Sequence, residues 1–258
     1  YYAPVQPPKW ADPARLEQKE LRRAASRLSF ATMTSLPIQV LWTTLATLIL
    51  TVCGVNFMGP NTIGGFPPTA YYLISSIASF LSIVLPFSFF LFFGKRKLSD
   101  TVLVEKNGVL NSVLLVFAGL AVSVLMNIPA NLISQLLEGA GLNGDANTAD
   151  LLAMTPVQAL TMFVSVVLVA PVTEEFAFRS VTTAVMRRWG DWPAVIFSAL
   201  IFGMAHYSIQ SLPVVLMAGF VMALLYVRTR NIWVNIFVHM LNNCLLYTSP
   251  SPRDSTSS

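Results

Sequence analysis

Ionisable side chains are rare in the apolar stretches of this 258-residue chain, and most of those present are of types that transfer protons. Glu174, Glu175 and Arg179 lie in one apolar stretch, and the chain's two histidines, His206 and His239, lie in two others. An ionisable residue inside a membrane span costs about 2.5 to 3.5 kcal/mol and usually marks function. Histidines placed at random would also fall in loops, so we predict that these five residues form a catalytic site.

The spacing of these residues assigns them to helix faces. Glu175 and Arg179 are four positions apart, so they can pair on one face. Because adjacent helix residues point about 100° apart, we expect the two glutamates to face different partners. That leaves Glu174 free to act as a general base. His239 and Asn243 are also four positions apart, and both can donate hydrogen bonds to a developing oxyanion.

Each of these residues also has a structural interpretation. Glu175 with Arg179 is more often a structural ion pair than a catalytic one, and Glu174 could be a protonated contact between helices. An intramembrane histidine or asparagine can simply join two helices by a hydrogen bond. All of these explanations must hold at once for the residues to have no catalytic role, so the catalytic interpretation is the stronger one.

The elements that must position these residues are membrane spans. Hydrophobic residues make up 55% of the chain and charged residues 11%, whereas a soluble domain carries about a quarter charged residues. Since about 20 apolar residues cross the hydrocarbon core, we predict an all-α, polytopic transmembrane helical bundle with about seven spans. Their predicted ranges are Pro37–Met58, Ala70–Phe93, Ser112–Leu136, Pro156–Phe178, Pro193–Tyr207, Leu212–Val227 and Ile232 onward.

Basic residues lie between the predicted spans and indicate an orientation. They cluster at residues 19–27, 95–97, 187–188 and 228–230, and every cluster falls on one side if the N-terminus is cytoplasmic. We therefore expect a multi-pass protein in the lipid bilayer of a bacterial inner membrane, with its N-terminus in the cytoplasm. This distribution excludes a nucleic-acid-binding patch.

The chain divides into four predicted segments. Residues 1–30 form a basic juxtamembrane segment, 31–150 the N-terminal spans, 151–243 the catalytic core and 244–258 a non-native tail. Asp12-Pro13 predicts the start of a basic helix, which either lies on anionic lipid or is solvated. Residues 244–254 match one reading frame of a common transposase-type sequencing adapter, so we expect the native sequence to be cut near Asn243.

Three motifs in order resemble those of the CPBP intramembrane proteases. This family comprises CAAX proteases and bacteriocin-processing enzymes, including the Abi proteins and the type II CAAX prenyl endopeptidases. The motifs are Glu174-Glu175-Phe176-Ala177-Phe178-Arg179, then Phe202-x-x-x-His206, then His239-x-x-x-Asn243. Each motif alone is short, but three in order on predicted spans are specific. One departure is Ser180, where family members commonly have glycine after the arginine.

The resemblance implies an intramembrane endopeptidase whose substrate is a membrane-associated protein or peptide, with prenylated CAAX-type proteins as one class. The implied roles are activation of a water by Glu174 and His206, oxyanion stabilisation by His239 and Asn243, and shaping of the site by Glu175 and Arg179. A glutamate-dependent mechanism needs no cofactor and is slightly preferred. The alternative is a metalloprotease with Zn²⁺ held by Glu174, His206 and His239.

Two other functions stay open. A non-catalytic membrane scaffold or bacteriocin-immunity-type protein would keep the motifs for structure, and its phenotype would survive substitution of Glu174 by alanine. A proton-coupled transporter would use Glu174 and the histidines as a proton relay. Such transporters typically show paired broken helices or an inverted repeat, and neither is visible in the sequence.

Overall fold

The computed structural model describes residues 12–55, 66–142 and 154–248, and these residues form helices joined by short segments. No β-strand occurs within these ranges, where extended pairing is limited to isolated bridge residues such as Val104 and Asn231. The predicted all-α helical bundle is therefore confirmed. The non-native tail predicted from residue 244 lies outside the described residues from position 249 onward.

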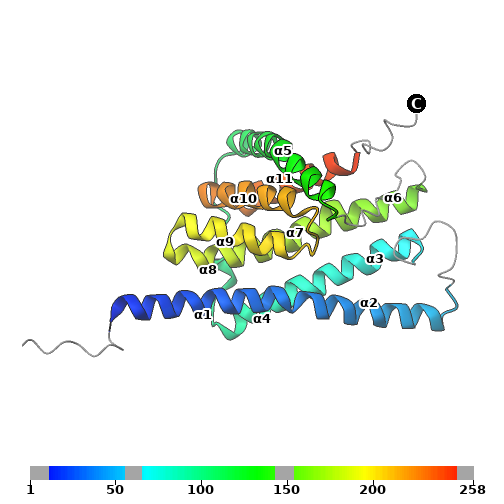
Figure 1. Ribbon diagram of the computed structural model, residues 1–258, viewed down its shortest axis with the longest axis horizontal. Coiled ribbons are helices and arrows are strands. Elements are labelled where there is room, and N and C mark those ends of the chain that lie inside the picture. Colours follow the sequence, from blue (N-terminus) through cyan, green and yellow to red (C-terminus); the bar gives the residue numbers. More distant parts are fainter. Residues whose placement is uncertain (1–11, 56–65, 143–153, 249–258) are drawn as a thin grey trace, which may run out of the picture.

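Each predicted span corresponds to an apolar helix or to a run of short helices that continue one another (Figure 1). The N-terminal half contains α1 (Pro13–Met33), α2 (Ser35–Val52), α3 (Pro68–Ser79), η2 (Phe80–Val84), α4 (Leu85–Phe93), η3 (Leu98–Asp100) and α5 (Val109–Gly139). The C-terminal half contains α6 (Pro156–Met162), η5 (Phe163–Val169), α7 (Ala170–Glu174), η6 (Glu175–Thr183), α8 (Ala184–Met186), η7 (Arg187–Trp189), α9 (Asp191–Met204), α10 (Leu212–Thr229) and α11 (Ile232–Thr248).

Within the described ranges, 5 helical runs are long and apolar enough to cross a membrane, and the chain is a multi-pass membrane protein. Two shorter apolar helices, Asp191–Met204 and Ile232–Leu245, correspond to the fifth and seventh predicted spans. The run Pro156–Trp189 continues well past Phe178, where we expected the fourth span to end. Arg179 follows that expected end, but its side chain is buried and paired, so its charge does not interrupt the helical run.

The N-terminal basic helix continues into the first span. Asp12 caps it, because the Ala14 N–H donates to Asp12 Oδ1 at 3.0 Å, as the Asp-Pro pair predicted. Farther along the helix, Leu28 is buried and Glu20 pairs with Arg188 at 2.6 Å. Part of this helix therefore packs against the protein rather than only against lipid or water.

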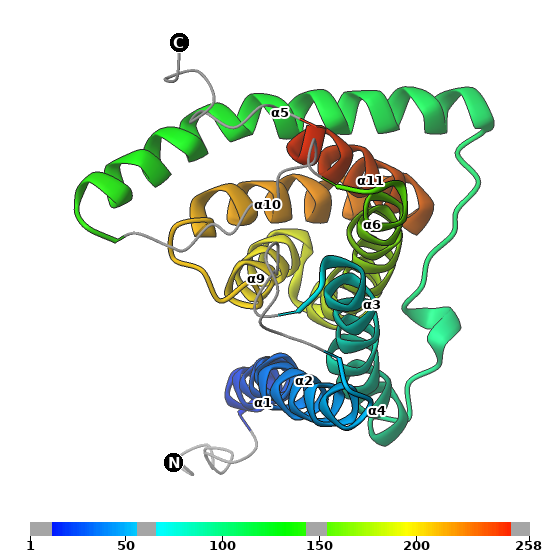
Figure 2. The ribbon, with the colours of Figure 1, turned by 90° about the vertical axis from the view of Figure 1, so that its right-hand side faces the viewer.

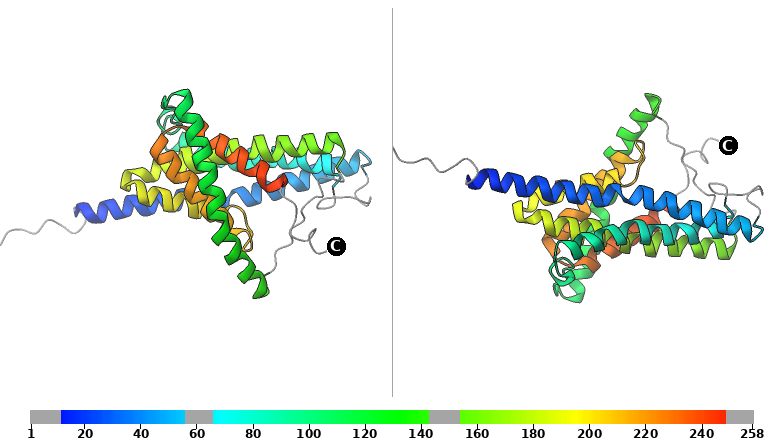
Figure 3. Two further views of the ribbon diagram at one scale, coloured as in Figure 1. Left: turned by 90° about the horizontal axis from the view of Figure 1, so that it is seen from above. Right: turned by 90° about the horizontal axis from the view of Figure 1, so that it is seen from below.

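The helical run from α6 to η7 lies in the middle of the molecule. In Figure 2, α9, α10 and α11 lie to one side of it and α3 and α4 to the other, while α5 passes over α10 and α11. Figure 3 shows that α5 crosses the direction of the remaining helices. The main core cluster joins Leu28, Phe87, Phe178, Phe202 and Val238 from five different helices. This arrangement surrounds η6, which carries Glu175 and Arg179.

Candidate active site

The helical run that carries the diglutamate contains two π-helical segments, in which hydrogen bonds span five residues instead of four. The first, η5, ends just before Pro171, whose ring has no N–H and crowds the carbonyl four residues earlier. In the second, η6, the hydroxyls of Thr182 and Thr183 each donate at 3.0 Å to a carbonyl five residues earlier. Such wide turns change which side chains share a helix face, and so they help to aim both glutamates.

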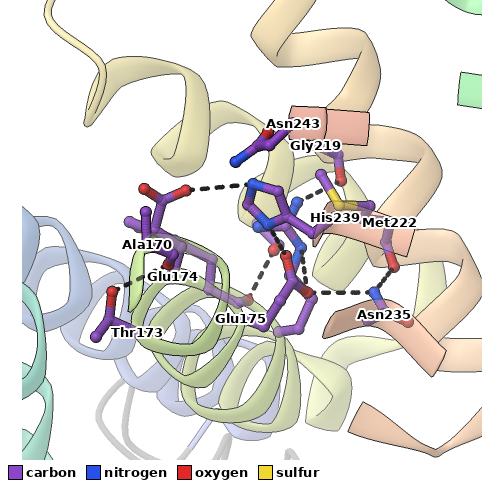
Figure 4. A network of polar contacts seen from close by, with 12 residues as sticks. Ala170, Thr173, Glu174, Glu175, Gly219, Met222, Asn235, His239 and Asn243 are labelled. Atoms are coloured by element: carbon purple, nitrogen blue, oxygen red, sulfur yellow. Dashed lines mark hydrogen bonds and ion pairs between the residues drawn. The ribbon is translucent and has the colours of Figure 1, made fainter. Parts of the chain in front are cut away.

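Glu175 is the buried centre of a polar network (Figure 4). Its side chain and that of Arg179 are 0% exposed, and Arg179 Nε lies 3.4 Å from Glu175 Oε2, which forms the predicted pair. His239 Nδ1 lies 2.9 Å from Glu175 Oε1, and Asn235 Nδ2 donates to Glu175 Oε2 at 3.3 Å. A buried carboxylate is tolerated only when it is paired and hydrogen-bonded, and these three partners meet that requirement.

Glu174 approaches the same imidazole from its other edge, with Oε2 3.8 Å from His239 Nε2 (Figure 4). Our expectation that the two glutamates face different partners is therefore wrong. The reason is that an imidazole has two nitrogens, and the ring of His239 lies between the two carboxylates. The Glu174 side chain is 15% exposed, against 0% for Glu175, and 3.8 Å is too long for a hydrogen bond. Glu174 thus keeps oxygen lone pairs available for water.

His206 is connected to this network through Phe202. Its Nδ1 lies 2.8 Å from the carbonyl oxygen of Phe202. A carbonyl oxygen can only accept, so Nδ1 carries the proton and Nε2 is left as an acceptor. The Phe202 ring contacts both histidine rings, with ring centroids 4.7 Å apart for His206 and 6.0 Å apart for His239. The guanidinium carbon of Arg179 lies 4.1 Å from the centroid of the Phe202 ring. In the described structure the polar contact of His206 is with the backbone and not with Glu174.

Asn243 lies close to His239 on the same face of α11 (Figure 4). Its Nδ2 donates to the carbonyl oxygen of Val166 at 2.9 Å. Val166 belongs to η5, where the wide turn alters the hydrogen bonding of the backbone carbonyls. The contact therefore ties Asn243 to the helical run that carries Glu174 and orients its amide, which has a second N–H left to donate.

The ligand set proposed for zinc is not assembled. Among the residues with described positions, no group of three or more His, Cys, Asp or Glu side chains is close enough to hold a metal ion. Glu174 and His239 approach one another, but His206 is not gathered with them into such a group. The arrangement of these side chains does not fit a three-ligand zinc site, so the chemistry below uses none.

Asn235 is a site residue that our sequence analysis missed. It is buried on α11, and besides Glu175 its Nδ2 reaches the carbonyl oxygen of Met222 on α10 at 2.6 Å. Asn235, His239 and Asn243 follow one another at intervals of four, so they share one face of an apolar helix. That polar stripe was visible in the sequence and could have identified Asn235.

Comparison with known proteins finds similarity in the part of the chain that carries this site. Residues 156–245 match a family model described as type II CAAX prenyl endopeptidase Rce1-like, and this range includes all three motifs. A curated protein of Bacillus subtilis (strain 168) named "Putative membrane peptidase YdiL" is 31% identical over 140 residues. The aligned region covers 54% of this chain and 57% of that relative, so the chain spans little more than half of the relative's length. No solved structure matches the chain.

Proposed function

We propose that this chain is an intramembrane endopeptidase of the CPBP type, because residues 156–245 match the family model of the Rce1-like type II CAAX prenyl endopeptidases. Its substrate would be a membrane-associated protein or peptide, with prenylated CAAX-type proteins as the class to test first. The observation that carries this proposal is the placement of Glu174 Oε2 3.8 Å from His239 Nε2 while Glu175 holds the opposite nitrogen.

Glu174 is the proposed general base. It takes a proton from a water molecule as the water oxygen bonds to the scissile carbonyl carbon, and the carbonyl oxygen becomes an oxyanion. When the C–N bond breaks, Glu174 returns that proton to the leaving amine, so atoms and charge balance. His206 is proposed to hold the same water, because its Nδ1 proton is donated to Phe202 and its Nε2 is left to accept.

His239 and Asn243 are the proposed oxyanion donors. Glu175 holds the Nδ1 edge of His239, so the Nε2 edge faces Glu174 and, when protonated, can donate to the oxyanion. Asn243 has one amide N–H bound to Val166 and a second available. Glu175 and Arg179 then act by orienting His239 and need not touch the substrate.

The experiment is a cleavage assay on the full chain in lipid vesicles, with paired CAAX peptides, farnesylated and unmodified, beside a mixed-sequence peptide library read by mass spectrometry. We expect Glu174→Gln to lower cleavage at least about 100-fold, because it removes the general base. Glu138→Gln, the same change at an exposed glutamate on α5, is the matched control and should cleave at the wild-type rate.

Full activity of Glu174→Gln would contradict the proposal. A chelator arm separates the two mechanisms, because a glutamate-dependent enzyme keeps its rate in chelator whereas a zinc enzyme loses it. A chain that cleaves no peptide and whose biological phenotype survives Glu174→Gln would support the scaffold interpretation instead.

A further inference from the structure

A groove runs along the helical run that carries the diglutamate, on the side of the second span. Its walls come from η2 and α4 on one side and from η5, α7 and the start of η6 on the other, and it encloses about 840 Å³. The lining is mostly apolar and includes Phe80, Val84, Phe92, Leu168, Val172 and Phe176. Phe80, Phe92 and Val172 are exposed, so the groove opens outward toward the surroundings of the bundle.

One end of this groove carries a cation, because Arg96 is among the lining residues. The backbone there is held by the end of α4. Lys95 adopts a left-handed conformation with φ 51°, its N–H bonds to Phe92 O at 3.1 Å, and the Arg96 N–H bonds to Leu91 O at 3.0 Å. This is the hydrogen-bonding pattern of a Schellman motif. Arg96 is thus kept at a defined place beyond the last turn of the helix.

The basic residues around Arg96 differ from those of the later clusters. In the described ranges Lys95, Arg96 and Lys97 form no salt bridge. The later clusters do form them, between Arg187 and Asp191, Arg188 and Glu20, and Arg230 and Glu105. A basic group left without a carboxylate at the end of an apolar groove is complementary to a ligand with an apolar chain and an anionic head.

The length of the groove fits one leaflet of a bilayer. From Phe80 to Phe93 the helical run rises about 20 Å, and half of a bilayer including its headgroups is about 20 to 22 Å thick. Arg96 follows at the end that carries the basic residues, which is where the headgroup layer lies. An acyl chain laid along the groove therefore brings its phosphate to the guanidinium.

We propose that this groove binds an anionic phospholipid of the phosphatidylglycerol type, with its phosphate at Arg96 and one acyl chain between α4 and α7. A zwitterionic lipid fits less well, because its phosphate is already neutralised by its own cationic group and gains less from Arg96. The bound lipid contacts Thr173 and Phe176, on either side of the diglutamate in sequence. This inference does not depend on the proteolytic function.

The test is native mass spectrometry of the detergent-purified full chain, titrated with phosphatidylglycerol or with phosphatidylcholine of the same acyl chains. The wild-type chain should bind phosphatidylglycerol about fivefold more tightly, the effect of one basic residue near an anionic surface. Arg96→Gln should remove that preference. Lys97→Gln, a neighbouring cation outside the groove lining, is the matched control and should keep it.

A second variant tests the apolar part of the site. Ser88→Trp fills the groove without changing charge, so it should weaken binding of both lipids. If Arg96→Gln and Lys97→Gln lowered the preference for phosphatidylglycerol equally, the lipid would be attracted diffusely to a basic surface, and the proposal would be overturned. Equal binding of both lipids by the wild-type chain, or unaltered binding by Ser88→Trp, would also overturn it.

Discussion

At the scale of single residues, the site is built around one buried carboxylate, Glu175, whose two oxygens both have partners. Glu175 is held by Arg179, His239 and Asn235, and its position fixes which edge of His239 faces Glu174. Breaking a buried pair by removing one partner typically costs about 3 to 5 kcal/mol. The carboxylate of Glu175 therefore stabilises the core and orients the imidazole of His239, whereas Glu174 is free to react.

Asn235→Ala is the prediction at this scale. It removes the donor to Glu175 Oε2 and to Met222 O, so the free energy of unfolding should fall by about 1 to 3 kcal/mol. A Glu175 side chain that is held less firmly also orients the imidazole of His239 less firmly. We therefore expect kcat for peptide cleavage to fall at least about tenfold with KM unchanged, as expected for an interaction made only in the transition state.

The control is Asn107→Ala, which also removes an amide donor, to the carbonyl of Thr229, but does so away from Glu175. It should lower stability and leave kcat unchanged. If the two variants changed kcat equally, Asn235 would have a general packing role and no role in positioning the site.

At the scale of the helix, a proline follows each of two π-helical segments and favours its wide turn. Pro171 follows η5 and Pro86 follows η2, and in both places a proline removes a backbone donor next to a π-helical segment. π-Helical segments occur frequently at functional sites. Here η5 holds Val166, which accepts from Asn243, and η6 begins at Glu175.

Pro171→Ala should restore ordinary helical hydrogen bonding in η5, because alanine supplies the missing N–H. The helix should be as stable or more stable in thermal unfolding, while Glu174 rotates relative to His239 and cleavage falls at least about tenfold, since small displacements of a reacting group are costly. Pro86→Ala, at the other wide turn, should retain cleavage. Wild-type cleavage by Pro171→Ala would show that the proline does not set the geometry of the site.

At the scale of the whole molecule, orientation in the membrane decides from which side the site is reached. The basic clusters predict a cytoplasmic N-terminus. The exposed Cys53 at the end of α2 would then lie on the opposite side, and residues 95–97 on the cytoplasmic side.

Labelling with a membrane-impermeant maleimide in intact cells checks this orientation, in a Cys244→Ser background. Cys53 should be labelled in intact cells. In the chain carrying Cys53→Ser and Lys97→Cys, labelling should appear only after the membrane is permeabilised. The opposite pattern would invert the topology and place the site near the other face of the membrane.

The sequence by itself determined the class of fold, the spans and the chemical groups of the candidate site. Composition required a membrane protein, apolar runs located the helices, and the spacing of four positions paired Glu175 with Arg179. These features are local, since they depend on neighbours within one helix or on the length of one apolar run. The polar stripe that contains Asn235 was local as well and could have been read in the same way.

Only the tertiary structure decided how these groups meet. His239 is 64 positions from Glu175, and its placement between two carboxylates follows from the packing of α11 against η6. The groove ending at Arg96 likewise depends on helices far apart in the chain. Helical periodicity states which side chains share a face, but it does not state which faces pack together, because that choice belongs to the core as a whole.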